Sequence, residues 1–456
     1  MTSIPLAIGW YVFLICVLWA FQHLTRCFTY LNVFSLFVLF LVIRYGITVP
    51  FDNDVNWWFA RISISNEALV RFYVSLVMMY LFLLIGISLG IHLFGNADIE
   101  PETFHTEMRK KLLPAGINWA LFLPVLTIGV GLVVVYHLRS TYSLTDLLSG
   151  ALSASDYRMG RIEYGSEILY SNSWALRLAS ISRFGLFPLF IFTLYFLKER
   201  HTAWYGLFIF VLVVGIVAGL LSGQKSPALL LMIGLGLAIL LRKGQLRLNL
   251  LDWRILISLG VGILVILPFL YRLQYPYLEY DQALEATFYR LTSEYDRSLQ
   301  LYFEIYPDVR PFQYGASASL INSLLGNNIP TDMLPERFIP TYYLGPTYPN
   351  TWNAVFVGYA WADFGFVGVV LESVIVGILL QWDARWFSRA RKTALVMGTQ
   401  VSLMLAATKI SEVALTAGLL SFGLLSSFLV YVIVRKYPKH VLESRQIVNA
   451  DNVNRT

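Results

Sequence analysis

The chain alternates long apolar runs with short polar links, and one polar stretch is much longer than the others. About eleven segments are close to the roughly 20 apolar residues that a helix needs to cross the hydrocarbon core of a bilayer. We predict membrane-spanning helices over 5–23, 30–50, 70–94, 117–138, 179–197, 203–221, 226–241, 255–270, 353–380, 394–409 and 413–434. The pattern therefore predicts an all-α polytopic membrane protein with about 11 transmembrane helices, within a range of 10–14.

The longest polar stretch, 271–352, is crowded with Tyr, Arg, Glu, Asn and Pro. An unpaired backbone polar group costs several kcal/mol in hydrocarbon, so this segment must lie at the membrane surface. Apolar and aromatic residues recur at helical spacing from Ala283 to Tyr306, which predicts that the loop is partly helical. We expect the loop to cover a site between the helices and to carry the chemistry.

Lysine and arginine concentrate in links that fall on one side of the membrane under this segmentation. The basic links contain Arg109, Lys110 and Lys111; Lys198 and Arg200; Arg242, Lys243 and Arg247; Arg385, Arg389, Arg391 and Lys392; and the tail from Arg435. Because cytoplasmic loops are enriched in Lys and Arg, we predict that this side is cytoplasmic. The N-terminus and the loops 51–68, 139–178 and 271–352 then face outward.

Composition supports the membrane assignment and limits the function classes. The chain is 57% hydrophobic and only 14% charged, against roughly 25% charged in soluble domains. The net charge of +6 is accounted for by the basic links, so it gives no reason to expect nucleic acid. We predict one membrane domain over 1–437 and a polar cytoplasmic tail over 438–456. Cys16 and Cys27 belong to or follow the first span and cannot cross-link the outer loops.

Two groups of cations are candidates for binding phosphate. Arg290, Glu294 and Arg297 are spaced to share one helical face, and paired guanidinium groups are well suited to a pyrophosphate. The alternative is that Glu294 pairs with one arginine on a solvated surface helix. Lys225, in the tight turn 222–227, needs a partner at the membrane edge or extends to the interface.

Other polar patterns are less specific. Asp52 and Asp54 resemble a carboxylate pair for a divalent ion, but a solvated turn beside Trp57 and Trp58 has the same pattern. The histidines have no metal-ligand spacing, and we predict no metal site and no cofactor. The tyrosines and tryptophans of the outer loops suit either a membrane interface or stacking on sugar rings. Asn350, Asn353 and Gln313 would supply hydrogen bonds to sugar hydroxyls.

Two motifs resemble those of a known family. After the long loop comes Asn350-Thr351-Trp352-Asn353, followed by Gly358-Tyr359-Ala360-Trp361-Ala362-Asp363-Phe364-Gly365-Phe366-Val367-Gly368 leading into a span, and the turn Ser222-Gly223-Gln224-Lys225-Ser226 opens another span. This pattern resembles the Wzy-type oligosaccharide repeat-unit polymerases, which include O-antigen polymerases. The resemblance covers the whole topology but rests on about twenty residues.

The resemblance implies a multi-pass glycosyltransferase of the bacterial inner membrane whose active site faces the periplasm. Such an enzyme joins undecaprenyl-pyrophosphate-linked oligosaccharides, with the pyrophosphate lipid as leaving group. It also implies a flippase and a chain-length regulator as partners, beside the lipid bilayer. The chain departs from the Arg-x10-Gly motifs of some members, because Arg158, Arg161, Arg290 and Arg297 have no Gly at that distance.

This reading assigns residues to roles in glycosyl transfer. Cations that stabilise the developing charge of the leaving group lower the barrier, and a carboxylate removes the proton of the acceptor hydroxyl. Asp363 is also compatible with a helix-start carboxylate or a partner for a nearby backbone turn. The predicted catalytic residues are Lys225, Arg290, Arg297, Asp363 and Glu294. The predicted substrate-binding residues are Arg158, Arg161, Gln224, Arg337, Asn350, Asn353 and Tyr359.

Two other functions remain as alternatives. An O-antigen ligase would share the lipid donor, although the histidine that would favour it is missing from the long loop. A polysaccharide transporter or flippase would need a polar cavity through the spans. The charges that we find within predicted spans are few, notably Arg44, Arg183 and Glu372, which argues against transport.

Overall fold

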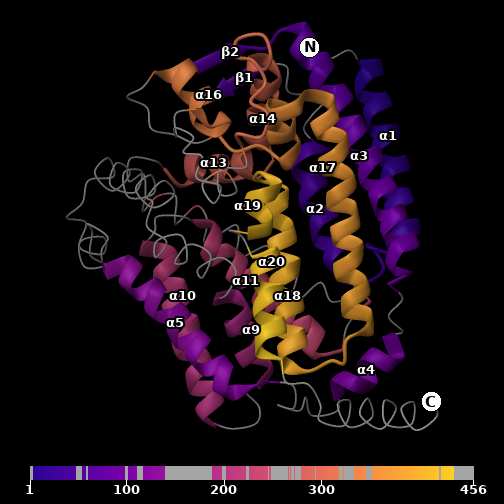
Figure 1. Ribbon diagram of the computed structural model, residues 1–456. Helices are drawn as coiled ribbons and strands as arrows, with labels where there is room; N and C mark the ends of the chain where they lie inside the picture. Colours follow the sequence, from indigo (N-terminus) through magenta and orange to yellow (C-terminus); the bar gives the residue numbers. More distant parts are fainter. Residues whose placement is uncertain are drawn as a thin grey trace, which may run out of the picture.

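The architecture is mostly helical (Figure 1). The computed structural model describes residues 4–47, 54–57, 60–97, 101–109, 117–138, 187–197, 202–221, 225–244, 246–247, 265, 268, 272, 279–292, 294–317, 322, 333–345, 352–420 and 423–435. The helices are α1 (Ile4–Thr25), α2 (Val33–Tyr45), α3 (Asn66–Phe94), α4 (Pro101–Arg109), α5 (Trp119–Leu138), α9 (Phe187–Leu197), α10 (Thr202–Leu221), α11 (Lys225–Arg242), α13 (Tyr280–Thr292), α14 (Glu294–Ile305), α16 (Pro335–Leu344), α17 (Phe356–Arg389), α18 (Ala394–Ile410), α19 (Leu415–Leu420) and α20 (Leu424–Val434). Strands β1 (Asp54–Trp57) and β2 (Ala60–Ser63) form an antiparallel hairpin.

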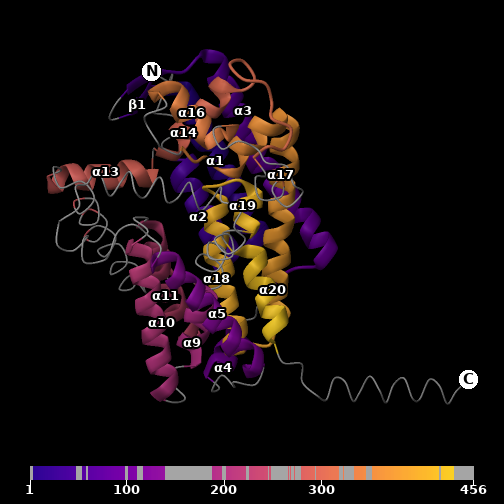
Figure 2. The same cartoon turned by 60° about the vertical axis from the view of Figure 1, so that its left-hand side comes forward.

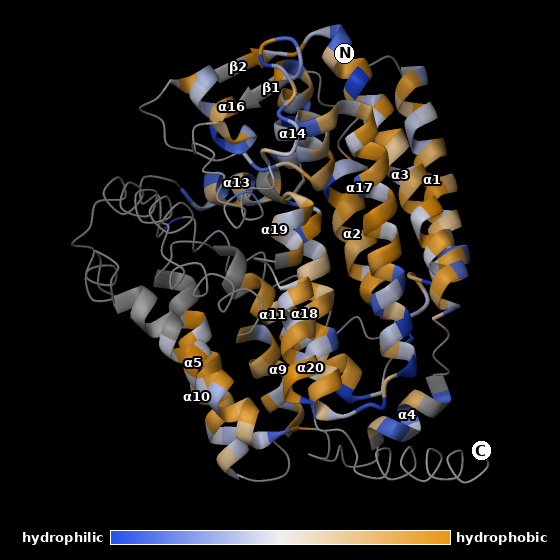
Figure 3. Cartoon of the chain, in the orientation of Figure 1, coloured by the Kyte–Doolittle hydropathy of each residue, from blue (hydrophilic) through white to orange (hydrophobic). Residues whose placement is uncertain are grey.

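Ten of the described helical segments are apolar, and some of them also have the length of a membrane span. Four are long and apolar enough to cross a bilayer: Pro5–Thr25, Asn66–Phe94, Phe356–Arg389 and Leu415–Val434, the last covering α19 and α20. Shorter apolar helices occupy Val33–Tyr45, Trp119–Gly131, Phe187–Leu197, Thr202–Ile216, Leu229–Arg242 and Ala394–Ile410. Figure 3 shows hydrophobic residues along these helices and hydrophilic residues near their ends. The chain is therefore a mostly helical membrane protein.

These helices coincide with ten of the predicted segments, although several boundaries differ. Most of 255–270 lies outside the described residues. The predicted span 353–380 coincides with the first part of a longer helix, because α17 runs from Phe356 to Arg389. Its polar extension is ordered by contacts with the end of α3: Gln381 Nε2 donates to Gly95 O at 2.9 Å and Arg385 Nε donates to Phe94 O at 3.1 Å. Gln381 and Arg385, which the sequence places in a polar link, thus donate hydrogen bonds to backbone carbonyl groups at the end of α3.

Helices α3 and α17 pack very closely along their length. A Cβ atom on Gly86 would lie 2.3 Å from the carbonyl oxygen of Val374, and one on Gly377 would lie 2.5 Å from that of Leu83. Small residues let two backbones approach in a membrane, where dispersion contacts between helices contribute most of the packing energy. The α3–α17 pair therefore forms a rigid central element (Figure 1).

The bundle has two different polar ends. At one end, which we call the cap end, lie the β1–β2 hairpin, α13, α14 and α16 (Figures 1 and 2). At the other, which we call the basic end, lie α4 and the lower ends of α11, α17 and α20. Contacts between distant basic links support this grouping. Arg242 Nη1 donates to Met108 O at 3.1 Å, and the backbone of Arg435 forms an antiparallel β-bridge with that of Ile117.

One prediction about the long loop 271–352 is wrong. Its helical segment is divided into α13 and α14, so Arg290 belongs to a different helix from Glu294 and Arg297, and the single face expected for these three residues does not form. Carboxylates in the first turn favour a new helix start, because they stabilise the positive end of its dipole. Glu294 and Asp296 occupy the first turn of α14.

We expect Gly377→Leu to destabilise the protein by about 3 kcal/mol or more, because the new side chain must displace the backbone of α3. Gly206→Leu on α10 is the matched control, since a Cβ there meets no atom within 4 Å. Thermal unfolding of the two variants in the same detergent measures the difference. Equal midpoints for both variants would contradict the close α3–α17 contact.

Candidate functional site

A buried arginine marks the cap end of α2. Arg44 is 5% exposed and donates from Nη1 to Ser411 Oγ at 2.6 Å, while its Nη2 pairs with Glu412. Its guanidinium carbon lies 4.5 Å from the centre of the Tyr295 ring and 4.9 Å from that of Phe40. Arg44 therefore connects three elements: its own helix, the residues after α18, and the first turn of α14.

A second buried cation shares the same carboxylate. Lys409, near the end of α18, is 4% exposed, and its Nζ lies 2.5 Å from Glu412 Oε2. Although burial alone raises the pKa of Glu412, the charges of Arg44 and Lys409 lower that pKa below its ordinary value. Glu412 therefore stays ionised between two cations, and these three groups together carry one positive charge.

A fourth charge lies close by on α14. Asp296 is fully buried and accepts a hydrogen bond from the backbone N–H of Arg297 at 2.8 Å. Asp296 and Glu412 both act electrostatically on Tyr45, whose buried hydroxyl has no hydrogen-bond partner among the described residues. We call Arg44, Lys409, Glu412 and Asp296 the cap-end charge cluster. Polar groups at this density in an apolar bundle are characteristic of functional sites in membrane proteins.

The predicted cations lie at the same end as this cluster. Arg297 and Glu294 belong to the first turns of α14, next to Tyr295, which covers Arg44. Lys225 begins α11, which packs against α18 and ends at the basic end with Arg242, so Lys225 lies at the cap end. Arg290 lies in α13, which contacts both α2 and α14. The side chains of Lys225 and Arg290 lie outside the described residues.

An aromatic layer lies beside the cluster, between α14, α16 and α17. Tyr302 is fully buried, its hydroxyl donates to Trp352 O at 3.0 Å, and its ring centre is 5.4 Å from that of Tyr359. Trp361 Nε1 donates to Tyr306 O at 3.0 Å. The rings of this layer are buried, so they pack the cap helices onto α17 and offer a ligand only their edges.

A carboxyl group with an altered pKa borders this layer. Burial raises the pKa of Glu336, in the first turn of α16, from 4.5 to about 7. The negative charge of Asp363 contributes in the same direction, and Arg337 opposes it. Its Oε2 atom is buried and makes no hydrogen bond to any described residue. Glu336 thus combines an available oxygen atom with a pKa near neutrality, which suits a general base.

Asp363 has a different surrounding. It is 2% exposed, and its carboxylate accepts hydrogen bonds from the backbone N–H of Ser317 at 3.2 Å and from the Ser317 hydroxyl. Helix α17 is interrupted by a kink two residues later, at Gly365, and the carboxylate is occupied by Ser317. Asp363 is therefore the partner of a nearby backbone turn, as one interpretation of the sequence predicts.

The glycine motif around Asp363 has a structural explanation. Gly365 adopts φ +60° and ψ −143°, which kinks α17 in a conformation that residues with a side chain avoid. Gly358 and Gly368 allow close approach: a Cβ atom on them would lie 2.7 Å from Ala354 Cβ and 2.2 Å from Ala360 O, respectively. These three glycines of the motif shape the helix that carries Asp363.

The remaining predicted site residues fall into two groups. Tyr359 and Asn353 lie together in the aromatic layer, with 3.4 Å between the tyrosine hydroxyl and the amide oxygen. Arg337 follows Glu336 on α16. Outside the described residues are Arg158, Arg161, Gln224 and Asn350, together with Asp52. The roles assigned to this second group therefore stay predictions from the sequence.

Sequence reasoning missed several charged groups that the fold brings together. Lys409 closes a predicted span, and Asp383 lies in what reads as a link, so neither stands out. Glu412 and Glu336 do not belong to any recognisable sequence motif. The one available signal was Arg44, a charge inside a predicted span, because such a charge requires a buried partner elsewhere. In the described ranges no three His, Cys, Asp or Glu side chains group as a metal site.

No protein family, curated protein or solved structure compared with this chain matches it.

We expect Glu412→Ala to destabilise the protein by about 3–5 kcal/mol, because Arg44 and Lys409 would remain buried without their shared carboxylate. Asp308→Ala is the control, since it breaks the Arg71–Asp308 pair, in which the Asp308 side chain is 51% exposed. That change should cost less than about 1 kcal/mol. Thermal unfolding in detergent compares them, and similar losses for both would contradict a buried network.

We also expect Glu336→Gln to alter the pH dependence of stability. Because the folded state raises the pKa of Glu336 from 4.5 to about 7, the wild type binds an extra proton between these values and loses stability as the pH rises through them. The variant lacks this loss, so its stability relative to the wild type should increase by about 1–3 kcal/mol from pH 4.5 to pH 8. Unfolding curves across this range measure the difference, with Glu67→Gln as control. A pH-independent difference would contradict the assignment.

Proposed function

We propose that the protein is a polymerase that joins undecaprenyl-pyrophosphate-linked oligosaccharide repeat units into a surface polysaccharide. The observation that carries the proposal is the pair of buried cations, Arg44 and Lys409, which share one carboxylate at the cap end beneath α14. Glu412 and Asp296 balance the charge of these two cations, so the positive excess that suits a pyrophosphate on a lipid chain would come from Arg297, Arg290 and Lys225 around the cluster. The motif resemblance described above adds to this support.

The leaving group determines what the site has to do. Departure of a pyrophosphate develops negative charge on its oxygen atoms, and fixed cations in an apolar surrounding stabilise that charge strongly. Arg297 and Arg290 on the cap helices and Lys225 at the start of α11 would bind the pyrophosphate from above the cluster. Arg44 and Lys409, balanced by Glu412 and Asp296, would hold α14 and its Arg297 in place beneath it.

The acceptor sugar would bind at the edge of the aromatic layer, where the half-buried Glu336 would be the base. Tyr295 covers Arg44, and Tyr302, seven residues later on α14, is electrostatically coupled to Glu336. A helix rises about 1.5 Å per residue, so the two regions are separated by roughly 10 Å along α14. This separation leaves room for a donor sugar between its pyrophosphate and the acceptor hydroxyl. Asp363 is less suited to the role, because Ser317 occupies its carboxylate.

The proposal includes a location and partners. With about eleven spans and the basic end in the cytoplasm, the cap would face the periplasm of a bacterial inner membrane. A flippase would deliver the lipid-linked unit, and a chain-length regulator would limit the product. No cofactor is required by this reaction, since the donor already carries its leaving group.

A transporter of lipid-linked sugars is the second candidate, and one observation favours it. Within α17, Glu372 Oε2 and Asp383 Oδ1 are buried and make no hydrogen bond to a described residue. Carboxylates inside membrane helices are typical of ion and proton pathways. Glu372 is one of the few intramembrane charges recognised from the sequence, and Asp383 adds to them. A ligase that transfers the chain to a lipid A core remains a third alternative.

The test is polymer length after incubation of the purified protein in lipid with its cognate undecaprenyl-pyrophosphate repeat unit. We expect a ladder of products for the wild type. Lys225→Ala and Arg290→Ala should shorten or abolish the ladder, and Glu336→Gln should lower kcat by about 10²–10⁴-fold, as loss of a general base does. Arg71→Ala, which removes a cation from the rim of the cap, is the control and should leave the ladder intact.

Other outcomes identify the alternatives. If the repeat unit crosses the bilayer without being joined, the protein is a transporter. If chains form only when a lipid A core acceptor is supplied, it is a ligase. Normal ladders from the Lys225, Arg290 and Glu336 variants would refute the proposed site while leaving the activity established.

A further inference from the structure

A cavity of about 320 Å³ lies at the basic end, far from the cap-end charge cluster. It is enclosed by the end of α1, the connection to α2, the residues after α3, and the lower parts of α17 and α18. Its volume falls in the range of about 300–1,000 Å³ typical of small-molecule sites. Nothing in the proposed polymerase reaction uses it.

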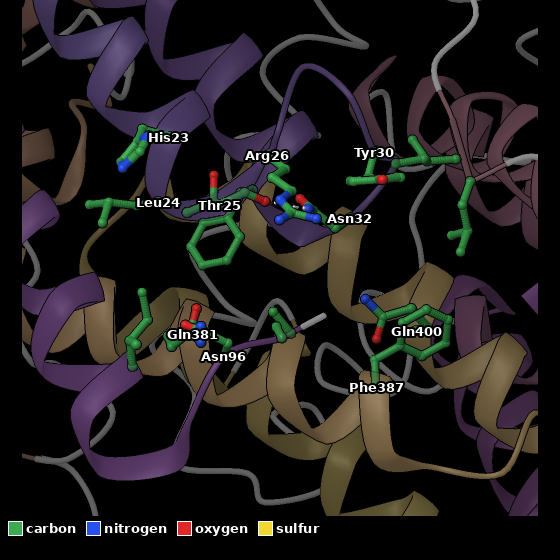
Figure 4. A pocket seen from close by; sticks show the side chains of 16 residues that line it. His23, Leu24, Thr25, Arg26, Tyr30, Asn32, Asn96, Gln381, Phe387 and Gln400 are labelled. Atoms are coloured by element: carbon green, nitrogen blue, oxygen red, sulfur yellow. Dashed lines mark hydrogen bonds between the residues drawn. The ribbon is translucent and has the colours of Figure 1, made fainter. Parts of the chain in front are cut away.

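The cavity has a polar mouth and a buried polar floor. Figure 4 shows Arg26 and Asn32 on one side, facing Gln381, Asn96 and Gln400 on the other. Arg26 and Asn96 are exposed, whereas Gln381 and Gln400 are 2% and 1% exposed. A ligand that enters from the membrane surface would therefore meet a cation first and amide groups last.

The walls are held in place by hydrogen bonds. Arg26 adopts a left-handed φ of +53°, and the turn that it begins is closed by bonds from the N–H groups of Thr29 and Tyr30 to Arg26 O at 2.9 and 2.8 Å. Leu31 N donates to Leu246 O at 2.6 Å, which fixes the turn to the α11 end. The cavity is thus preformed rather than a gap between loosely packed helices.

The floor contains an acceptor that lacks a donor. Gln400 Nε2 contacts Asp383 Oδ2 at 3.4 Å, but Gln400 Oε1 is buried and makes no hydrogen bond to any described residue. A buried acceptor without a partner is costly, and a ligand hydroxyl would satisfy it. A phosphate group, which only accepts hydrogen bonds when fully ionised, would not.

The mouth and its surroundings favour an anion. Arg26 and His23 line the opening, and Arg385 holds the segment 94–96 through Phe94 O and Asn96 O. Lys392 lies over the ring of Phe387, another lining residue, at 4.4 Å. Asp383, which Gln400 contacts, and Glu107, which acts on Lys392, are opposing charges, but neither lines the cavity. The potential is therefore positive at the mouth, where a phosphate would bind.

We propose that this cavity binds a phosphate ester that carries free hydroxyl groups, with the phosphate at Arg26 and a hydroxyl donating to Gln400 Oε1. Two sources have this chemistry: the headgroup of a polyol phospholipid such as phosphatidylglycerol, and a soluble polyol phosphate. The proposal is independent of the polymerase reaction, because the cavity and the cap-end charge cluster lie at opposite ends of α2, and Gln400 precedes Lys409 by more than two turns of α18.

The experiment is native mass spectrometry of the delipidated, full-length protein with dioleoyl phosphatidylglycerol or dioleoyl phosphatidylcholine. Phosphatidylcholine has the phosphate but no hydroxyl donor in its headgroup. Thermal shift with glycerol 3-phosphate tests the soluble source. We expect Arg26→Gln and Gln400→Leu to weaken binding at least about tenfold, as loss of a ligand hydrogen bond in a desolvated site does. Arg389→Gln, an exposed cation of the same end that does not line the cavity, is the control.

Each outcome decides between sources or rejects the site. Preferential binding of phosphatidylglycerol that both cavity variants weaken supports the lipid source, and the same pattern for glycerol 3-phosphate alone supports the soluble one. Equal binding of the two lipids, binding unaffected by the cavity variants, or no binding of either ligand would overturn the proposal. Asn96→Leu, at the exposed mouth, replaces Gln400→Leu if that variant does not fold.

Discussion

The arrangement of the cap end depends on the carboxylate of Glu412, which neutralises one of two buried cations. Without it, neither Arg44 nor Lys409 would be stable among apolar helices, because an unpaired buried charge costs several kcal/mol. The network joins α2 to the end of α18, and the stacking of Tyr295 on Arg44 adds α14. The cap helix is therefore positioned by a charge inside the bundle as well as by its own apolar face.

Much of the helical architecture is predictable from the sequence, because an apolar run of sufficient length has few alternatives in a bilayer. The boundaries are less predictable, since they depend on tertiary contacts. The extension of α17 to Arg389 is stabilised by bonds from Gln381 and Arg385 to the end of α3, and no local pattern reveals these partners. The division between α13 and α14 likewise places Arg290 and Arg297 on separate helices, although their spacing fits one face.

The candidate site was harder to predict than the fold. Arg297 and Glu294 are at the cap end as expected, but Lys409, Glu412 and Glu336 acquire their chemistry only from neighbours distant in sequence. The motif that gave the family resemblance contains glycines required by packing and by the kink of α17. Its Asp363 binds a turn. A motif can therefore reflect how a helix is shaped as much as what it catalyses.

Helix α18 is buried along its whole length, from Ala394 to Ile410. It carries Gln400 near its middle and Lys409 near its C-terminal end, and it touches α2, α9, α11, α17 and α20. A helix surrounded only by protein does not adjust its tilt directly to the thickness of the surrounding bilayer. Lipids act on it only through its neighbours. The depth of Lys409 is consequently a property of the fold, so the same charge would stand at the same height in membranes of different thickness.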